Sequence, residues 1–157
     1  MGIRGKQSTR VSRHLNAPRT RVYLALLDAS AIATWMAPPG MTIHLHAFEG
    51  RENGTIRISL TYDDPIEKGK TTEHTGTYHG RFMKLVPNEQ VVEEVEFETT
   101  DPALRGKMMI TITFADAGDG TDLVAMHEAL PPGLSIADNE AGWKLSLAKL
   151  AEPVEAG

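Results

Sequence analysis

The sequence predicts an α+β fold: a curved antiparallel sheet of about six or seven strands around one long C-terminal helix. Residues 135–150 repeat apolar side chains at helical spacing, whereas most of residues 10–128 alternate apolar and polar side chains, as strands do. Short turns separate these strands, so neighbours along the chain pair antiparallel. Each strand has one apolar face, and the helix is expected to cover it.

The predicted C-terminal helix carries a broad apolar face and a marked beginning. Pro-Pro-Gly at 131–133 ends the preceding strand, and Ser135 stands three residues before Asp138, as in a helix-capping arrangement. The apolar face consists of two neighbouring stripes, Ala141, Leu145 and Ala148 in the first and Trp143, Leu147 and Leu150 in the second.

The N-terminal part predicts a strand followed by two short helices. Residues 7–15 place Thr9, Val11, Arg13 and Leu15 on one face of a strand. Pro18 suits the first turn of a helix, because its missing N–H has no partner there. Helical spacing then continues to about residue 36, with a break near 28–30.

From residue 41 onward apolar side chains recur at every second position, as they do in strands. The expected strands are 41–48, 56–62, 72–85, 91–99, 108–114 and 123–129, with turns at 50–54, 87–88 and 118–121 and a polar loop at 63–70. Gly76 and Gly80 lie inside the longest strand and predict where it bends, since glycine tolerates the backbone of a bulge.

Composition favours one domain over residues 1–157, with ends at 1–6 and 152–157 that fray. Hydrophobic residues make up 41% and charged residues 24%, as in globular proteins. No stretch has the roughly 20 apolar residues of a membrane span, and no signal peptide is recognisable, so we expect a cytoplasmic protein without membrane insertion. The absence of cysteine excludes disulfides. A net charge of −5 without Lys or Arg clusters argues against nucleic acid as a partner.

Short motifs in a fixed order resemble the START-like superfamily, also called SRPBCC, and within it the bacterial branch related to the C-terminal domain of the activator of the heat-shock-protein-90 ATPase. One departure is Asn53, where that branch usually has a glycine. The motifs are Ala17-Pro18 with Val22-Tyr23, Trp35, Asn53-Gly54, Tyr78-His79-Gly80, Val86-Pro87-Asn88-Glu89, Thr121, His127-Glu128, and Gly142-Trp143 with Leu147 and Leu150.

This resemblance implies a helix-grip fold with an elongated apolar pocket between the long helix and the sheet. The superfamily includes binders, cyclases and co-chaperones, so the fold alone does not imply one reaction. The same side chains could instead simply fill the core. The residues expected to contact a ligand are Trp35, Ile58, Tyr62, Tyr78, Phe82, Phe97, Ile110, His127, Trp143 and Leu147.

His127 and Glu128 are the residues most suited to acid–base chemistry. They end the last predicted strand, where an imidazole could orient a ligand or transfer a proton near neutral pH. Adjacent strand residues point to opposite faces, so at most one of the two enters the interior. The alternative is a pair that only makes local hydrogen bonds.

Metal binding and cofactor use have little support. His44 and His46 share a face that is solvated if Ile43 points inward, and His79 lies on another strand. We therefore expect no metal and no cofactor. No phosphate-binding glycine loop or nucleophile elbow is present. Glu93 is expected on the same strand face as Val91 and Val95. A buried carboxylate there needs a partner such as an arginine or a water molecule.

Three functions remain open. The first is binding of a small apolar or amphipathic molecule. The second is a cyclase or hydrolase that uses His127 with a pocket tyrosine, although the scarcity of convergent ionisable groups argues against an enzyme. The third is a co-chaperone that contacts a chaperone ATPase. The pattern fits a monomer or a homodimer formed through a sheet edge.

Overall fold

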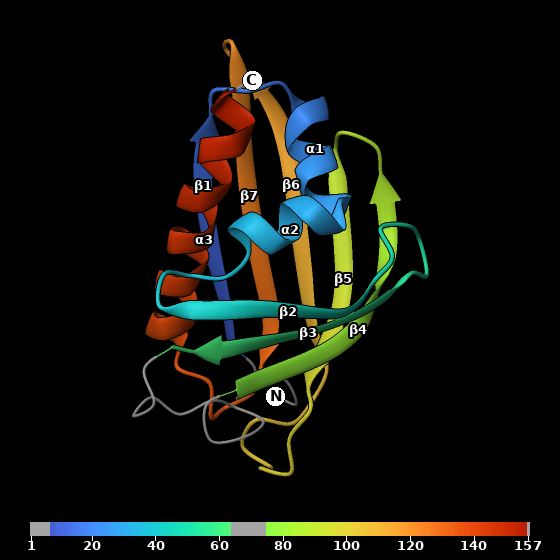
Figure 1. Ribbon diagram of the computed structural model, residues 1–157, viewed down its shortest axis with the longest axis vertical. Helices are drawn as coiled ribbons and strands as arrows, with labels where there is room; N and C mark the ends of the chain where they lie inside the picture. Colours follow the sequence, from blue (N-terminus) through green and yellow to red (C-terminus); the bar gives the residue numbers. More distant parts are fainter. Residues whose placement is uncertain (1–6, 64–74, 157) are drawn as a thin grey trace.

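The computed structural model describes residues 7–63 and 75–156, and Figure 1 shows their arrangement. Seven strands and three helices follow the predicted order. They are β1 Gln7–Leu15, α1 Arg19–Leu27, α2 Ala29–Trp35, β2 Met41–Phe48, β3 Thr55–Tyr62, β4 Thr75–Val86, β5 Gln90–Phe97, β6 Met108–Ala117, β7 Gly120–Leu130 and α3 Ile136–Ala156.

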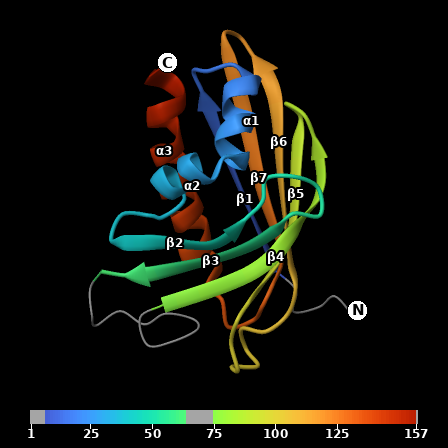
Figure 2. The ribbon, with the colours of Figure 1, turned by 45° about the vertical axis from the view of Figure 1, so that its right-hand side comes forward.

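All seven strands form one antiparallel sheet in the order β1-β7-β6-β5-β4-β3-β2. From β2 to β7, strands that follow each other along the chain pair with each other. The first strand, β1, pairs with the last, β7, and forms one edge of the sheet. The sheet does not close into a barrel. It curves so that β2, β3 and β4 cross in front of the strands at its other edge (Figures 1 and 2). The predicted α+β helix-grip fold is confirmed.

The helices lie on the concave face of this sheet. Asp28 ends α1 and begins α2, and its carboxylate accepts a hydrogen bond from Ser30 N at 3.3 Å. Helix α3 begins as predicted, because Asp138 N donates to the Ser135 hydroxyl at 3.1 Å. Helix α3 packs on β1 and on both short helices. No described helix is long and apolar enough to cross a membrane.

Two features of α3 differ from the sequence prediction. Of the two predicted apolar stripes, only the one with Trp143, Leu147 and Leu150 faces the sheet; Leu145 is 47% exposed. The helix also continues past residue 150 to Ala156, with Val154 buried. Residues 152–156, expected to fray, are helical, and Val154 is the one buried residue among them. At about 100° per residue the two stripes lie on opposite sides of the helix, so they form no single broad face and only one of them can meet the sheet.

The bend in β4 also differs from its prediction. The register shift against β5 falls between Phe82 and Lys84, not at Gly76 or Gly80. Gly80 has another reason to lack a side chain, since a Cβ there would lie 1.9 Å from the carbonyl oxygen of Glu94. The glycine allows β5 to approach closely. The predicted loop at 63–70 lies outside the described residues beyond Asp63.

Candidate functional site

The inner face of the sheet carries one row of side chains that mixes polar and apolar groups. Strand register aligns Phe82 on β4, Glu93 on β5, Ile110 on β6, His127 on β7 and Thr9 on β1. All five are buried. Neighbouring strands are about 4.8 Å apart, so the backbones of Glu93 and His127, two strands apart, are separated by about 10 Å across the sheet.

The hydrogen bonds of His127 determine its tautomer. Trp143 Nε1, which can only donate, lies 3.2 Å from His127 Nδ1. The Nδ1 atom must therefore accept, and a neutral ring then carries its proton on Nε2. That proton points to Met108 Sδ at 3.3 Å. Burial lowers the pKa of His127 to about 4, so the ring is neutral at physiological pH.

Asn139 on α3 joins this histidine to β1. Its side-chain oxygen accepts a hydrogen bond from the Thr9 hydroxyl at 2.6 Å, and its nitrogen lies 3.3 Å from His127 Nδ1. The His127 cluster, defined as Thr9, Met108, His127, Asn139 and Trp143, thus connects α3 to three strands. Both ring nitrogens of the histidine are engaged within it. The imidazole holds the helix and is not free to attack or deprotonate a substrate in this arrangement.

Glu93 has a different environment. The residue is only 8% exposed, and burial raises the pKa of its carboxyl to about 7. No described residue donates a hydrogen bond to this carboxyl or pairs with it as a cation. Burial, and secondarily the charge of Glu93, raises the pKa of Tyr78 above its usual range. The partner that the sequence required for this carboxylate is absent from the described protein.

The residues predicted to contact a ligand divide into two groups. Several belong to the solid core; Trp35, for example, is fully buried and its indole N–H donates to Ala25 O at 3.0 Å. The core group is Trp35, Ile58, Phe82, Ile110 and Leu147, with His127 buried in its polar cluster. The half-buried group is Tyr62, Tyr78, Phe97 and Trp143.

A set of half-buried apolar side chains lies at the end of the grip where α3 begins. We call it the rim, and it consists of Tyr78, Phe97, Leu104, Ile136 and Trp143. In Figure 1 the corresponding element ends, the start of β4, the end of β5, the β5–β6 loop and the start of α3, all lie at the lower end of the molecule. Among the described elements, helix α3 approaches β1, α1 and α2 more closely than it approaches β2, β3 or β4.

Two surface hollows lie over the outer face of the sheet. The first, about 370 Å³, is lined by residues of β4 and β5 that include His79, Arg81, Glu94 and Glu96. The second, about 330 Å³, lies over β1 and β7 around Arg10 and His14 and their neighbours. Both belong to the outer face of the sheet.

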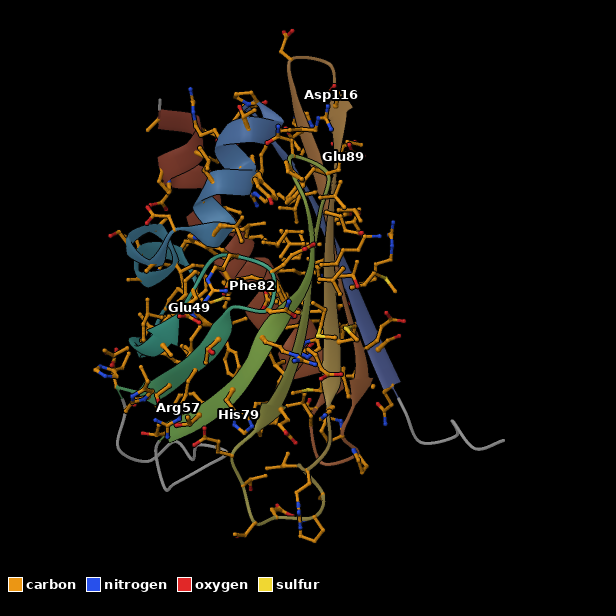
Figure 3. All side chains as sticks on the ribbon, turned by 90° about the vertical axis from the view of Figure 1, so that its right-hand side faces the viewer. Glu49, Arg57, His79, Phe82, Glu89 and Asp116 are labelled. Carbon is orange, nitrogen blue, oxygen red and sulfur yellow. The ribbon has the colours of Figure 1, made fainter. Side chains whose placement is uncertain are left out.

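The outer face carries an ionic network. Arg57 on β3 contacts Glu98 through two hydrogen bonds of 2.7 and 2.9 Å, and His79 Nδ1 lies 3.0 Å from the same carboxylate. The Arg57 hydrogen bond is the largest cause that lowers the pKa of Glu98 to about 2. Figure 3 shows Arg57 and His79 near each other at the lower end. His79 is also 3.4 Å from Glu96.

The histidines considered for zinc lie apart from the interior. His44 and His46 are exposed, with ring centroids 4.4 Å apart. Ile43 and Leu45, which alternate with them along β2, point inward. His46 Nε2 contacts the Ser59 hydroxyl at 2.8 Å. Among residues 7–63 and 75–156, no three His, Asp or Glu side chains gather as metal ligands.

Sequence reasoning missed three members of the His127 cluster, Thr9, Met108 and Asn139. Asn139 precedes Trp143 by four residues, so both side chains lie on one face of α3. A polar residue in line with a buried aromatic residue is the signal that points to a buried polar contact. Thr9 had been placed on the inner face of β1 without a role. Glu128 is exposed, as expected if His127 faces inward.

An open antiparallel sheet curved around a long C-terminal helix, with two short helices after the first strand, defines the START-like helix-grip class. Residues 16–155 match the family described as activator of Hsp90 ATPase homolog 1-like protein. The chain belongs to this family, which confirms the resemblance found in the sequence.

Solved structures agree with this assignment. A crystal structure of a protein from Chromobacterium violaceum is 31% identical, with a TM-score of 0.84 over 94% of this chain and 96% of that chain. The Aha1 dimer from Colwellia psychrerythraea, solved in solution, is 16% identical, with a TM-score of 0.68 over 95% and 96%. A putative protein in the dynemicin biosynthetic locus is 20% identical, with a TM-score of 0.67 over 94% of this chain but 47% of that one. The last two likenesses concern the fold alone. No curated protein matches the chain significantly.

Proposed function

We propose that this protein binds a small amphipathic molecule between the first half of α3 and the inner faces of β4 and β5. The supporting observation is the rim. Its aromatic and aliphatic side chains face the concave side of the sheet but stay partly exposed, as do Ile43, Leu45 and Leu60 on the neighbouring strands β2 and β3. Apolar surface that remains partly open beside buried polar groups is typical of a ligand site.

The polar groups behind the rim suit an amphipathic ligand better than a purely apolar one. Trp143 belongs both to the rim and to the His127 cluster, so a molecule that contacts its ring lies next to a polar interior. The Glu93 carboxyl lies two strands from His127 and has no hydrogen-bond or ion-pair partner among residues 7–63 and 75–156. A ligand with one polar end and an apolar body would contact both kinds of surface.

The geometry gives less support to a cyclase or hydrolase that uses His127. Its Nδ1 accepts hydrogen bonds from the helix and its Nε2–H points to a thioether. Catalysis at this ring would first require Trp143 to leave it. A neutral pKa-shifted imidazole is chemically able to accept a proton, but here its lone pair already has a donor.

A co-chaperone role is the alternative that the family description suggests. It would need a surface for a large partner. The exposed large hydrophobic residues of the described chain are Leu24, Met83 and Leu145, which lie on α1, β4 and α3. Because these three residues lie on three different elements, they do not form one apolar patch for a partner. We therefore rank this function below ligand binding.

Fluorescence of Nile red, a neutral apolar dye, tests the proposed site. Its emission should rise with the wild-type protein and fall again when octanol displaces it. Trp143→Ala should weaken dye binding at least fivefold, because it removes the largest rim side chain. Leu145→Ala, on the opposite side of the same helix, is the matched control and should bind as wild type. An unchanged emission with folded wild-type protein would overturn the proposal.

A further inference from the structure

We propose that the polar end of the ligand is a primary amine, held as an ammonium ion by the carboxylate of Glu93. This inference rests on the proposed function and deepens it by naming the chemical class of the ligand. It comes from the unpartnered carboxyl, from the charges that face the interior, and from the aromatic ring beside it.

The Glu93 carboxyl is buried and yet unsatisfied by the protein. Its residue is 8% exposed, and no described group hydrogen bonds to it. Every fully enclosed polar side-chain atom of the described chain does have a partner. The carboxyl oxygens of Glu93 must therefore keep a small accessible surface. A carboxyl in this position is expected to meet a donor that the protein itself does not supply.

The charges around the interior favour a cationic donor. No buried Lys or Arg lies on the inner face of the described strands, and Arg13, which shares that face on β1, is exposed. The helix residues Arg21 and Lys149 are engaged by the carbonyl oxygens of Val154 and Ala37. Glu93 is thus the one buried charged residue on this described face. An anionic ligand would be repelled, whereas an ammonium ion would gain a charge-assisted hydrogen bond.

Core side chains flank Glu93 on both neighbouring strands, and the body of such a ligand would lie along them toward the rim. Phe82 lies directly across from it on β4, and its ring is held edge-on to Phe48 with centroids 5.5 Å apart. An aromatic ring beside a carboxylate adds a favourable contact for an ammonium ion. Ile110 on the other side leads toward the His127 cluster and Trp143. A chain about 10 Å long would reach from the carboxylate to the rim.

Binding of an ammonium ion should release a proton from Glu93. At pH 7 a carboxyl with a pKa of about 7 is about half protonated, and the bound cation would ionise it fully. The other titratable groups facing this interior are Tyr23 on α1, Tyr62 on β3, Tyr78 on β4 and His127 on β7. The inner faces of β2 and β6 and the buried face of α3 carry none among the described residues. Tyr78 stays protonated and His127 stays neutral at this pH.

Displacement of Nile red by octylamine, octanol and octanoate tests the inference at pH 8. Octylamine should bind the wild type at least tenfold more tightly than octanol, which is about 1.4 kcal/mol. Octanoate should bind most weakly. Glu93→Gln should remove the preference for the amine and leave octanol affinity within twofold. Glu94→Gln, its outward-facing neighbour, should behave as wild type.

Calorimetry in two buffers of different ionisation enthalpy gives a second readout. Octylamine binding at pH 7 should release up to about half a proton from the wild type and none from Glu93→Gln. If octanol binds and octylamine binds no better, or if Glu93→Gln keeps the preference, the amine is refuted while the ligand site stands. If neither octanol nor octylamine displaces the dye from folded protein, the proposed function itself fails.

Discussion

The two ends of the grip are built differently. In Figure 1, α1 and the last turns of α3 lie at the upper end and α2 lies just below α1; these helices carry the buried apolar side chains Trp35, Leu150 and Val154. At the lower end the rim is half-buried, and the nearby interior contains His127 and Glu93. The first region contributes stability through close packing. The second has exposed apolar surface and an unpaired carboxyl, features that suit binding.

The largest effect should separate the two tryptophans. Trp35→Ala removes a fully buried ring and its hydrogen bond to Ala25 O, and should lower the free energy of unfolding by about 3–5 kcal/mol. Trp143→Ala removes a half-buried ring from the rim and should cost clearly less. Urea denaturation of both variants measures the difference. Equal losses would show that the lower end is as important to stability as the upper end.

A second comparison concerns the two stripes of α3. Leu147→Ala creates a cavity under the helix and should cost about 2–5 kcal/mol. Leu145→Ala is exposed and should stay within about 0.5 kcal/mol of wild type. The same denaturation experiment measures both. A large loss for Leu145→Ala would indicate that a partner or a second copy covers this stripe.

The pH dependence of stability should expose the strain at Glu93. The folded protein holds this proton up to pH 7, whereas an unfolded carboxyl loses it near 4.5. Between these values the folded state binds more protons, so this group makes stability fall as pH rises. The free energy of unfolding of Glu93→Gln, relative to that of wild type, should therefore rise between pH 4.5 and 7, by at most about 3 kcal/mol. Melting temperatures of both proteins from pH 4 to 8 measure this gain.

His127 contributes with the opposite sign. Its pKa falls from 6.5 to about 4 on folding, so the unfolded state binds more protons between these values and stability rises with pH. The two groups oppose each other from about pH 4.5 to 6.5. Wild-type stability should be nearly flat there, and Glu93→Gln should show the rising His127 slope. A flat profile for Glu93→Gln would contradict the burial of the imidazole.

Removing one partner of a buried hydrogen bond should have a smaller effect. Asn139→Ala leaves the Thr9 hydroxyl without its acceptor and should cost about 1–3 kcal/mol. The double variant Thr9→Val with Asn139→Leu removes both polar groups and should recover part of that loss. Chemical denaturation of the wild type, Thr9→Val, Asn139→Leu and the double variant gives the coupling between the two side chains. Full additivity would mean that the 2.6 Å contact does not form in solution.

The smallest effect should come from the outer face. Arg57→Ala breaks two hydrogen bonds to Glu98, but the Arg57 side chain is 45% exposed. Exposed ion pairs contribute about 0–1 kcal/mol, and the loss should shrink further in 1 M salt. Thermal melting at low and high salt measures it. A loss that salt does not change would point to packing by the Arg57 stem.

The sequence predicted the sheet and helices well because their signal is periodic. Alternation assigned Glu93 to the inner face, and adjacency required that His127 and Glu128 point to opposite faces. Contacts between distant elements carry no such signal. Asn139 and Thr9 meet across 130 positions, and nothing local indicates their pairing. The side of α3 that faces the sheet likewise depended on tertiary packing, so Leu145 was misplaced.

The pairing of β1 with β7 has a consequence for how the chain folds. Strands β2 to β7 form a meander of neighbours, so each can add to the last by closing a short loop. The first strand must instead find the last one across more than a hundred residues, at a larger entropic cost. On a ribosome, the earliest part of the polypeptide therefore waits for nearly the whole of its length before it acquires a neighbour.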